Sequence, residues 1–295
     1  MSRISRIATS GISALAAWAA TARAATLNTS NGYNMPTGIS DLAREVYGIH
    51  MIGLWVCVAI GVVVFGVMIY ALLKFRKSQG AVPDTTMVHS TKVEIVWTII
   101  PVCILVAMAV PASETLIKIE DTRNSQLTIR VTGYQWKWQY QYMDAADGVG
   151  FFSTLSRDSN EARQLRSGID PYTVPDYLLS VDHPLVIPSG AKVRLLVTAQ
   201  DVIHSWWVPD FAIKTDAIPG FVNEMWIRVP AGKEGTYRGQ CAELCGQDHG
   251  FMPIVVEVKT PSDFAAWVKE QKAQTKQAAA GHEPVAVKTA LNISG

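Results

Sequence analysis

Four sulfur or imidazole side chains able to ligate a metal lie within twelve residues near the C-terminal end of the chain. The stretch Cys241-Ala-Glu-Leu-Cys245-Gly-Gln-Asp-His249-Gly-Phe-Met252 contains two thiols, one imidazole and one thioether. A second imidazole, His204, precedes them in the run Ile-His-Ser-Trp-Trp. Thiolate and thioether ligands favour copper, and two His with one Cys and a weak axial Met form the type 1 copper pattern. The additional cysteine would let two thiolates bridge a pair of metal ions, each of which keeps one imidazole.

Two other interpretations of these cysteines remain open. In an oxidising compartment two nearby cysteines more often form a disulfide, and the Cys spacing alone favours that outcome. A zinc site with two Cys and two His is also chemically possible, because zinc accepts the same donors. Neither a disulfide nor zinc requires a thioether, so Met252 and His204 together favour copper. Cys57 and Cys103 lie inside apolar runs, where a thiol usually packs as a small hydrophobic side chain.

Short segments with alternating apolar and polar residues must position these ligands. Such segments, separated by turn signals such as Pro188-Ser-Gly and Pro230-Ala-Gly, are Leu127–Thr132, Lys192–Thr198, Glu224–Val229 and Met252–Val258. This pattern predicts a β-sandwich or small barrel. Tyr134 to Tyr142 carries five aromatic residues at every second position, which predicts one strand with an aromatic face. Residues 147–178 are less patterned and read as a long surface excursion.

Two apolar runs near the N-terminus are long enough to cross a membrane. Ile49–Leu73 and Val93–Ala112 contain 25 and 20 residues, and the second is interrupted by Pro101. The connecting loop is basic, with Lys74, Arg76, Lys77 and Lys92 against Asp84, so the positive-inside rule places it in the cytoplasm. Only 17% of the chain is charged, against about 25% in ordinary soluble domains. The net charge of +1 argues against nucleic-acid binding.

The two ends of the chain carry weaker signals. The first 40 residues contain no acid, and Ala22-Arg-Ala follows a mildly apolar stretch, which predicts a secretory signal peptide; a mitochondrial transit peptide is the alternative. Pro261 begins a short helix for which Ser262 is the expected N-cap. Beyond about Gln274 the composition predicts a disordered tail.

The string Cys-x-Glu-x-Cys-x-x-x-His-x-x-Met, with His204-Ser-Trp and Lys214-Thr-Asp-Ala-Ile-Pro-Gly, resembles cytochrome c oxidase subunit II from about residue 49 to 258. The resemblance implies a cupredoxin fold that carries a binuclear copper A centre. It implies bridging thiolates, terminal imidazoles and two weak ligands, namely Cys241 and Cys245, His204 and His249, and Met252 with the backbone carbonyl of Glu243. It further implies that the Glu243 side chain holds magnesium or manganese together with subunit I.

The resemblance assigns roles to other residues as well. Trp136 would receive the electron, and Glu94 would lie at the mouth of a proton channel in subunit I, although an acid in the first turn of a helix can equally be structural. A ring of acids would dock cytochrome c, namely Asp144, Asp147, Asp182 and Asp201. Position 141, acidic in many relatives, is Gln141 here. Isolated acids are usually only solvated surface, so this ring is a hypothesis.

The expected fold class is a two-helix transmembrane hairpin followed by an all-β cupredoxin-like domain, a Greek-key sandwich or barrel. The expected segments are a signal peptide (1–25), a periplasmic segment (26–48), membrane helices (49–75 and 93–113), a cytoplasmic loop (76–92), a periplasmic copper domain (114–262) and a C-terminal helix with tail (263–295). The chain would relay electrons to haem in subunit I, and its partners would be subunits I and III, cytochrome c and the membrane. We expect a bacterial inner membrane, with the mitochondrial inner membrane as the alternative.

Three rival functions are weighed against this one. The related subunit of a quinol oxidase lacks the copper ligands, whereas all of them are present here. A soluble copper A enzyme such as nitrous oxide reductase needs a separate multi-His cluster, and this chain has six His and two predicted spans. A membrane-anchored copper chaperone or zinc-binding assembly factor is separated from a copper pair by its bound-metal count.

Overall fold

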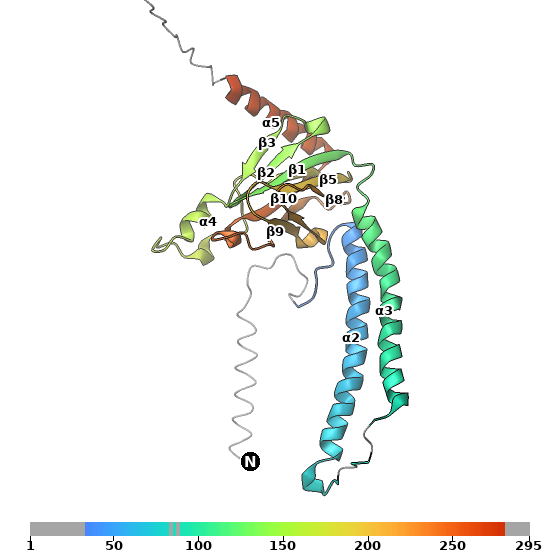
Figure 1. Ribbon diagram of the computed structural model, residues 1–295. Coiled ribbons are helices and arrows are strands. Elements are labelled where there is room, and N and C mark those ends of the chain that lie inside the picture. Colours follow the sequence, from blue (N-terminus) through green and yellow to red (C-terminus); the bar gives the residue numbers. More distant parts are fainter. Residues whose placement is uncertain (1–32, 83–84, 87–88, 281–295) are drawn as a thin grey trace, which may run out of the picture.

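A computed structural model describes residues 33–82, 85–86 and 89–280 of the chain. In these residues two long helices precede a β domain (Figure 1). The predicted signal peptide at 1–25, the start of the predicted periplasmic segment and the last part of the tail lie outside the described residues.

The two helices are α2 (Asp41–Lys74) and α3 (Thr91–Glu120), which run side by side below the β domain (Figure 1). Both are long and apolar enough to span a membrane, and the side chains of their apolar windows are not buried within the protein. Both helices extend beyond the predicted apolar spans into more polar flanking residues. The Ser40 hydroxyl caps α2 by accepting from the Ala43 amide at 2.9 Å. Pro101 and Pro111 are accommodated within α3.

The ends of the helices that face the sandwich are docked on it. The Ile39 amide donates to the Asp210 carbonyl at 3.0 Å, which fixes the start of α2. At the other helix, the Trp226 indole donates to the Lys118 carbonyl at 3.0 Å. Arg228 also pairs with Asp41 at 3.1 Å. The membrane hairpin therefore leads directly into the β domain.

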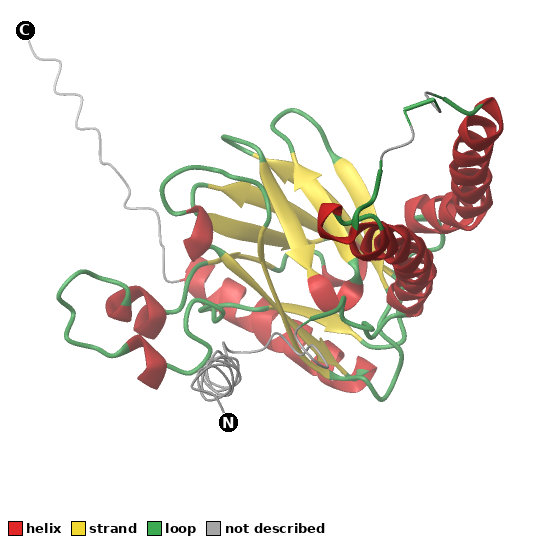
Figure 2. Ribbon diagram, turned by 90° about the horizontal axis from the view of Figure 1, so that it is seen from below, coloured by secondary structure: helices red, strands yellow, loops and turns green. Residues whose placement is uncertain are grey.

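The β domain is a sandwich of two five-stranded sheets (Figure 2). In spatial order the first sheet contains β3 (Gly150–Ser153), β2 (Lys137–Tyr142), β1 (Leu127–Tyr134), β5 (Val193–Ala199) and β8 (Asn223–Ile227). The second contains β4 (Leu185–Pro188), β10 (Pro253–Lys259), β9 (Gly235–Cys241), β6 (His204–Val208) and β7 (Ile213–Ala217). Strands β1 and β5 pair in parallel, as do β4 and β10. The predicted fold class is confirmed.

Alternating residues of the strands fill the space between the sheets. Ile129 and Val131 of β1 are fully buried, as is Leu195 of β5. Trp138 and Trp206 contribute the largest buried side chains, and the Trp206 indole donates to the Tyr140 hydroxyl at 3.3 Å. The metal-ligand candidates therefore stand at one edge of a closely packed core.

The prediction of a single aromatic strand from Tyr134 to Tyr142 is wrong. The chain reverses at Gln135 and Trp136, and Tyr134 at the end of β1 pairs with Lys137 at the start of β2. Trp138, Tyr140 and Tyr142 do share the buried face of β2. Trp136 instead belongs to the turn. The sequence pattern does not show this turn, because a two-residue hairpin turn leaves the alternation of aromatic residues uninterrupted.

The excursion after β2 contains more regular structure than predicted. A 3-10 turn, η2 (Asp144–Ala146), leads into β3, which pairs antiparallel with β2. Helix α4 (Arg157–Ala162) and the turn η3 (Pro171–Thr173) follow. This region projects from the sandwich on the side away from the membrane helices (Figures 1 and 2).

The C-terminal helix α5 (Pro261–Ala280) is capped by a different residue from the one predicted. The Thr260 hydroxyl, not that of Ser262, accepts from the Asp263 amide at 3.2 Å. Pro261 then occupies the first helical position, where its missing amide hydrogen costs nothing. The helix also continues beyond Gln274, where the composition predicts disorder. Trp267 packs its ring against Tyr142, with ring centroids 5.3 Å apart.

Candidate metal centre

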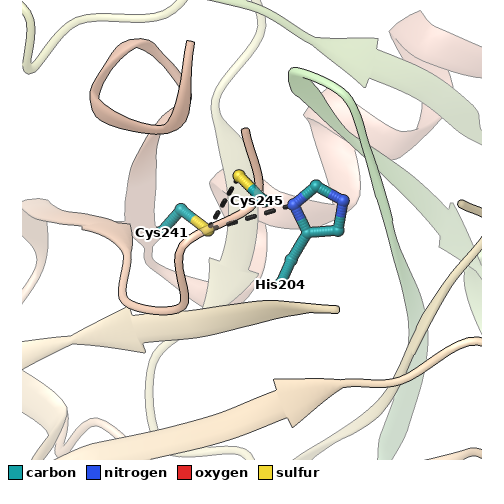
Figure 3. A group of neighbouring side chains, drawn as sticks. All are labelled: His204, Cys241 and Cys245. Carbon is teal, nitrogen blue, oxygen red and sulfur yellow. Dashed lines mark hydrogen bonds between the residues drawn. The ribbon is translucent and has the colours of Figure 1, made fainter. Parts of the chain in front are cut away.

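Two cysteine sulfurs form the middle of the candidate site (Figure 3). Cys241 ends strand β9 and Cys245 lies on the loop that follows, and both are buried. Their Sγ atoms are 3.9 Å apart, far beyond the roughly 2.05 Å of a disulfide. Two thiolates that share one tetrahedral ion with bonds of about 2.3 Å would lie about 3.8 Å apart. The pair is therefore spaced for a shared metal and is not a disulfide.

His204 approaches the first sulfur from the neighbouring strand. It opens strand β6, where the pairing of Trp206 with Cys241 brings β6 and β9 together. The Nδ1 atom of the fully buried His204 ring lies 4.0 Å from the Cys241 Sγ atom (Figure 3). The opposite ring nitrogen, Nε2, lies 2.9 Å from an oxygen of Asp201. A carboxylate there holds the proton on Nε2, so Nδ1 presents its lone pair to a metal.

The first sheet also confines the His204 ring. The ring packs edge-on against Trp138, with centroids 5.9 Å apart. On its other side is Gly133 of β1, where an added Cβ would lie only 2.8 Å from the ring atom Cδ2. Asp201 is itself held by the amides of Gln135 and Val202, each at 2.7 Å. His204 is thus confined by the two sheets and by an anchored carboxylate.

The remaining donors surround the second sulfur. His249 lies in the 3-10 turn η5 (His249–Phe251), and its Nδ1 atom is 3.5 Å from the Cys245 Sγ atom. The thioether sulfur of buried Met252 is also 3.5 Å from that atom. The carbonyl oxygen of Glu243 lies 3.3 Å from the Cys241 Sγ atom. An imidazole therefore lies beside each sulfur, and the carbonyl and the thioether lie beside Cys241 and Cys245, respectively.

The two thiols differ in acidity. Burial alone raises the pKa of Cys241, but its hydrogen bonds with His204 and with the backbone of Ser205 and Glu243 outweigh this and lower the pKa to about 7. Burial raises the pKa of Cys245, and the adjacent Cys241 thiolate raises it further, to about 12. Burial lowers the pKa of His204, but its bonds with Cys241 and Asp201 raise it overall. A bound cation would favour ionisation of both thiols.

Trp136 connects this centre to the surface. Its partly exposed indole donates to the backbone carbonyl of Cys245 at 3.2 Å. The amide side chain of Gln135 donates to the same oxygen at 2.9 Å. Gly246 follows, and an added Cβ there would lie 3.2 Å from the Trp136 ring. The turn between β1 and β2 thus rests directly on the ligand loop.

The other predicted site residues do not form one cluster. Asp144 and Asp147 follow β2, whose length of roughly 20 Å separates them from Trp136. Asp182 accepts from the Thr154 amide at 2.7 Å, and Asp201 lies beside His204. Exposed Glu243 lies on the ligand loop. Glu94 is in the first turn of α3, at the end remote from the sandwich.

Sequence reasoning missed the role of Asp201 as a support for His204. The spacing of three residues between this acid and an imidazole was available as a signal, but it is too common to be specific. The roles of Gln135 and Gly133 had no such signal, because each depends on a contact between segments distant in the sequence.

Comparison with known proteins identifies the family. Residues 127–259 match the family described as "Cytochrome C oxidase subunit II, periplasmic domain", and residues 28–114 match its transmembrane domain. The chain is 42% identical to "Probable cytochrome c oxidase subunit 2" of Rickettsia bellii over 80% of this chain and 82% of the relative. It is 34% identical to "Cytochrome c oxidase subunit 2" of Cereibacter sphaeroides over 83% of this chain and 82% of the relative.

A solved structure is also similar. The crystal structure of the periplasmic domain of subunit II of cytochrome oxidase (CoxB) of Bradyrhizobium japonicum is 40% identical, covers 52% of this chain and 99% of that chain, and has a TM-score of 0.44. The family matches span both the membrane helices and the β domain, and the identities hold over most of the chain. The chain therefore belongs to the cytochrome c oxidase subunit II family.

Proposed function

We propose that this chain is the electron-entry subunit of a haem–copper cytochrome c oxidase. It accepts electrons from cytochrome c at a binuclear copper A centre and passes them to haem in subunit I, where oxygen is reduced to water and protons are pumped. One observation carries the proposal: Cys241 and Cys245 are spaced to share metal ions, and two imidazoles lie beside the pair. A single zinc site has no need of the thioether of Met252 beside them.

The donor set fits a copper pair. Cys241 and Cys245 would bridge the ions, His204 and His249 would each ligate one, and Met252 and the Glu243 carbonyl would be the weak ligands. When bound, the pair supplies a one-electron acceptor whose charge is spread over two metals and two sulfurs. The protein keeps Cys241, Cys245, Met252 and His204 buried, which limits the access of water to these four ligands. No further side chain with a catalytic function is needed at such a relay.

Trp136 is the proposed point of electron entry. Its indole is partly exposed, so a haem protein can approach it from solvent. The hydrogen bond from the indole to the Cys245 carbonyl connects the ring to a ligand residue without an intervening side chain. This contact supports the role that the family resemblance assigns to Trp136.

Acidic surface residues would steer a basic cytochrome c toward this entry point. Asp144, Asp147 and Asp182 are exposed, and Asp201 lies within hydrogen-bonding distance of the turn that carries Trp136. The acids are dispersed along the sheet, which favours steering by their summed field over a single docking contact.

The remaining assignments concern the assembled oxidase. Exposed Glu243 would help to hold magnesium or manganese at the boundary with subunit I. Glu94 would lie near a proton-channel mouth, on the cytoplasmic side set by the basic loop. Subunits I and III would pack against the exposed helices α2 and α3. The bacterial relatives favour an inner membrane with the β domain in the periplasm, and a mitochondrial inner membrane is the alternative.

Copper content tests this function directly. The full chain, purified in detergent with its thiols reduced and then loaded with copper, should hold two coppers per chain. Once the reductant is removed and the centre is oxidised by one electron, its paramagnetic resonance spectrum should show one unpaired electron shared by two nuclei. A Cys241–Cys245 disulfide that persists after reduction and copper addition, or a single bound zinc ion, would overturn the proposal.

A further inference from the structure

The segment 154–180 projects beside the sandwich and contacts the ligand loop. It carries α4 and η3 and lies on the side of the domain opposite the membrane helices (Figures 1 and 2). None of the roles assigned above uses it. One of its residues, Arg163 at the end of α4, reaches the loop between Cys245 and Met252.

The Arg163 guanidinium makes three different contacts. Its Nε atom donates to the Asn160 side chain on its own helix at 2.8 Å. Its two terminal nitrogens face the two carboxylate oxygens of Asp248 at 3.3 and 3.4 Å, a bidentate pairing. The Cζ atom of the guanidinium lies over the Phe251 ring, 4.3 Å from its centre. The side chains of Arg163 and Asp248 are only 23% and 25% exposed, so solvent screens this pair less than an open surface pair.

These contacts hold the short turn that contains His249. Asp248 immediately precedes His249, and Phe251 ends the same turn. The Phe251 amide donates to the Asp248 carbonyl at 2.9 Å, which closes the turn from within. The Arg163 guanidinium therefore contacts one residue before His249 and one after it, Asp248 and Phe251. Because Arg163 belongs to another segment, these contacts hold the turn in place relative to the rest of the domain.

Segment 154–180 is itself anchored, so it can support the loop. Ser159 and Ala162 of α4 are buried, and the Ser159 hydroxyl accepts from the Leu178 amide at 3.2 Å. Arg238 of β9 donates to the Leu179 carbonyl and pairs with Asp176. The segment is thus tied to the strand that ends in Cys241 and, through Arg163, to the loop beyond Cys245.

The support matters because the two imidazoles are not held alike. Asp201 fixes the ring of His204, but among the described residues no carboxylate takes that place beside His249. The position of His249 depends instead on the turn that carries it.

We propose that Arg163 is a positioning residue for the His249 half of the metal centre. It acts through Asp248 and Phe251 and touches no ligand atom. The part of this inference that concerns copper rests on the proposed function, whereas the part that concerns the turn does not.

Two arginine substitutions on the same short helix test the proposal. Arg163→Ala removes the contacts with Asp248 and Phe251. Arg157→Ala is the matched control, since Arg157 pairs with Glu161 on its own helix and its side chain is 87% exposed. In the full chain in detergent, copper release to a chelator should be about 10-fold faster for Arg163→Ala, at the low end of the range for groups that orient a metal ligand. Arg163→Lys keeps the charge but not the bidentate geometry, and should give an intermediate rate.

A second readout needs no metal. In the copper-free chain, hydrogen exchange of the Phe251 amide should be faster in Arg163→Ala than in Arg157→Ala, while the Tyr237 amide in β9 should be unaffected. If the wild-type chain binds a copper pair but the two variants release it equally, the inference is wrong and the proposed function stands. If the wild-type chain binds no copper pair, the proposed function fails. In that case, equal exchange rates of the Phe251 amide in the two variants would also show that Arg163 does not hold the turn.

Discussion

The two imidazoles of the candidate centre are held by different parts of the molecule. His204 opens a β-strand, is fully buried, and is fixed by Asp201, Trp138 and the close approach of Gly133. His249 is half-buried in a short 3-10 turn whose position depends on contacts with neighbouring segments. One half of the site is therefore part of the packed sandwich, and the other half is part of a loop braced from outside.

This difference predicts how each half responds to substitution. A change beside His204 must disturb the interior of the sandwich, because close-packed interiors transmit volume changes. A change beside His249 can alter the ligand loop while the two sheets remain intact. We therefore expect core substitutions beside His204 to lower both the stability of the domain and its metal binding. Substitutions beside His249 should weaken metal binding alone.

The largest effect is expected from the sulfurs that join the two halves. If both bridge the same metal ions, Cys241→Ser and Cys245→Ser should each abolish the two-copper site, although each sulfur lies near a different imidazole. Cys57→Ser in α2 is the control. Metal analysis and paramagnetic resonance of the full chain provide the readout. A variant that still bound two coppers would show that its sulfur is not shared.

The next effect separates the halves by the same substitution in each. Gly133→Ala would place a Cβ 2.8 Å from the confined His204 ring, and such overpacking typically costs about 1–3 kcal/mol. Gly250→Ala lies in the turn of His249, where an added Cβ meets nothing within 4 Å. Thermal unfolding of the full chain in detergent should show a lower Tm for Gly133→Ala alone. Equal Tm values for the two variants would mean that the His204 ring can move to make room for the added methyl group.

A third variant tests whether Asp201 supports the site or only the surface charge. Asp201→Asn removes the charge that holds the proton on Nε2 of His204, and copper affinity should fall about 10–100-fold. Asp182→Asn, at an exposed acid bonded to Thr154, should leave copper affinity unchanged. A copper titration distinguishes the two variants. If both change only the salt dependence of electron entry from cytochrome c, then Asp201 acts in docking and not in positioning.

The smallest expected effect is on the pH dependence of stability, through an ion pair on the first sheet. A hydrogen bond with Arg194 holds the pKa of Glu224 below its ordinary value of 4.5. The pair therefore stabilises the fold above pH 4.5 and loses that contribution as the pH falls through the lower, folded-state pKa. Its partly exposed geometry limits the gain to about 0.5 kcal/mol.

Glu224→Gln should consequently lower Tm slightly at pH 7 and match the wild type at strongly acid pH, with Glu120→Gln at the exposed end of α3 as the control. A difference that grew toward low pH would contradict the sign.

Several features could be predicted because each depends on a short, continuous segment of sequence. The donor types of Cys241, Cys245, His249 and Met252 are adjacent, and the apolar runs of α2 and α3 are continuous. Strand alternation located β1, β5, β8 and β10. Local patterns such as these depend on the period of the backbone and need no knowledge of distant contacts.

Other features could not be predicted for the same reason. The turn at Gln135 and Trp136 leaves the aromatic alternation uninterrupted, so only the pairing of β1 with β2 reveals it. The short strand β3 is defined by its partner β2, and the cap on α5 falls to Thr260 because Pro261 takes the first helical position.

The donor atoms available to a metal, and the two segments apolar enough to span a membrane, follow from residue types and their local order alone. The approach of His204 to Cys241, its support by Asp201 and the contact of Arg163 with Asp248 follow only from the folded arrangement. The two groups of features differ in the distance along the chain that separates the residues concerned. A ligand type is a property of one residue, whereas its position depends on hydrogen bonds and packing between segments tens of residues apart, which form only when the two sheets close on each other.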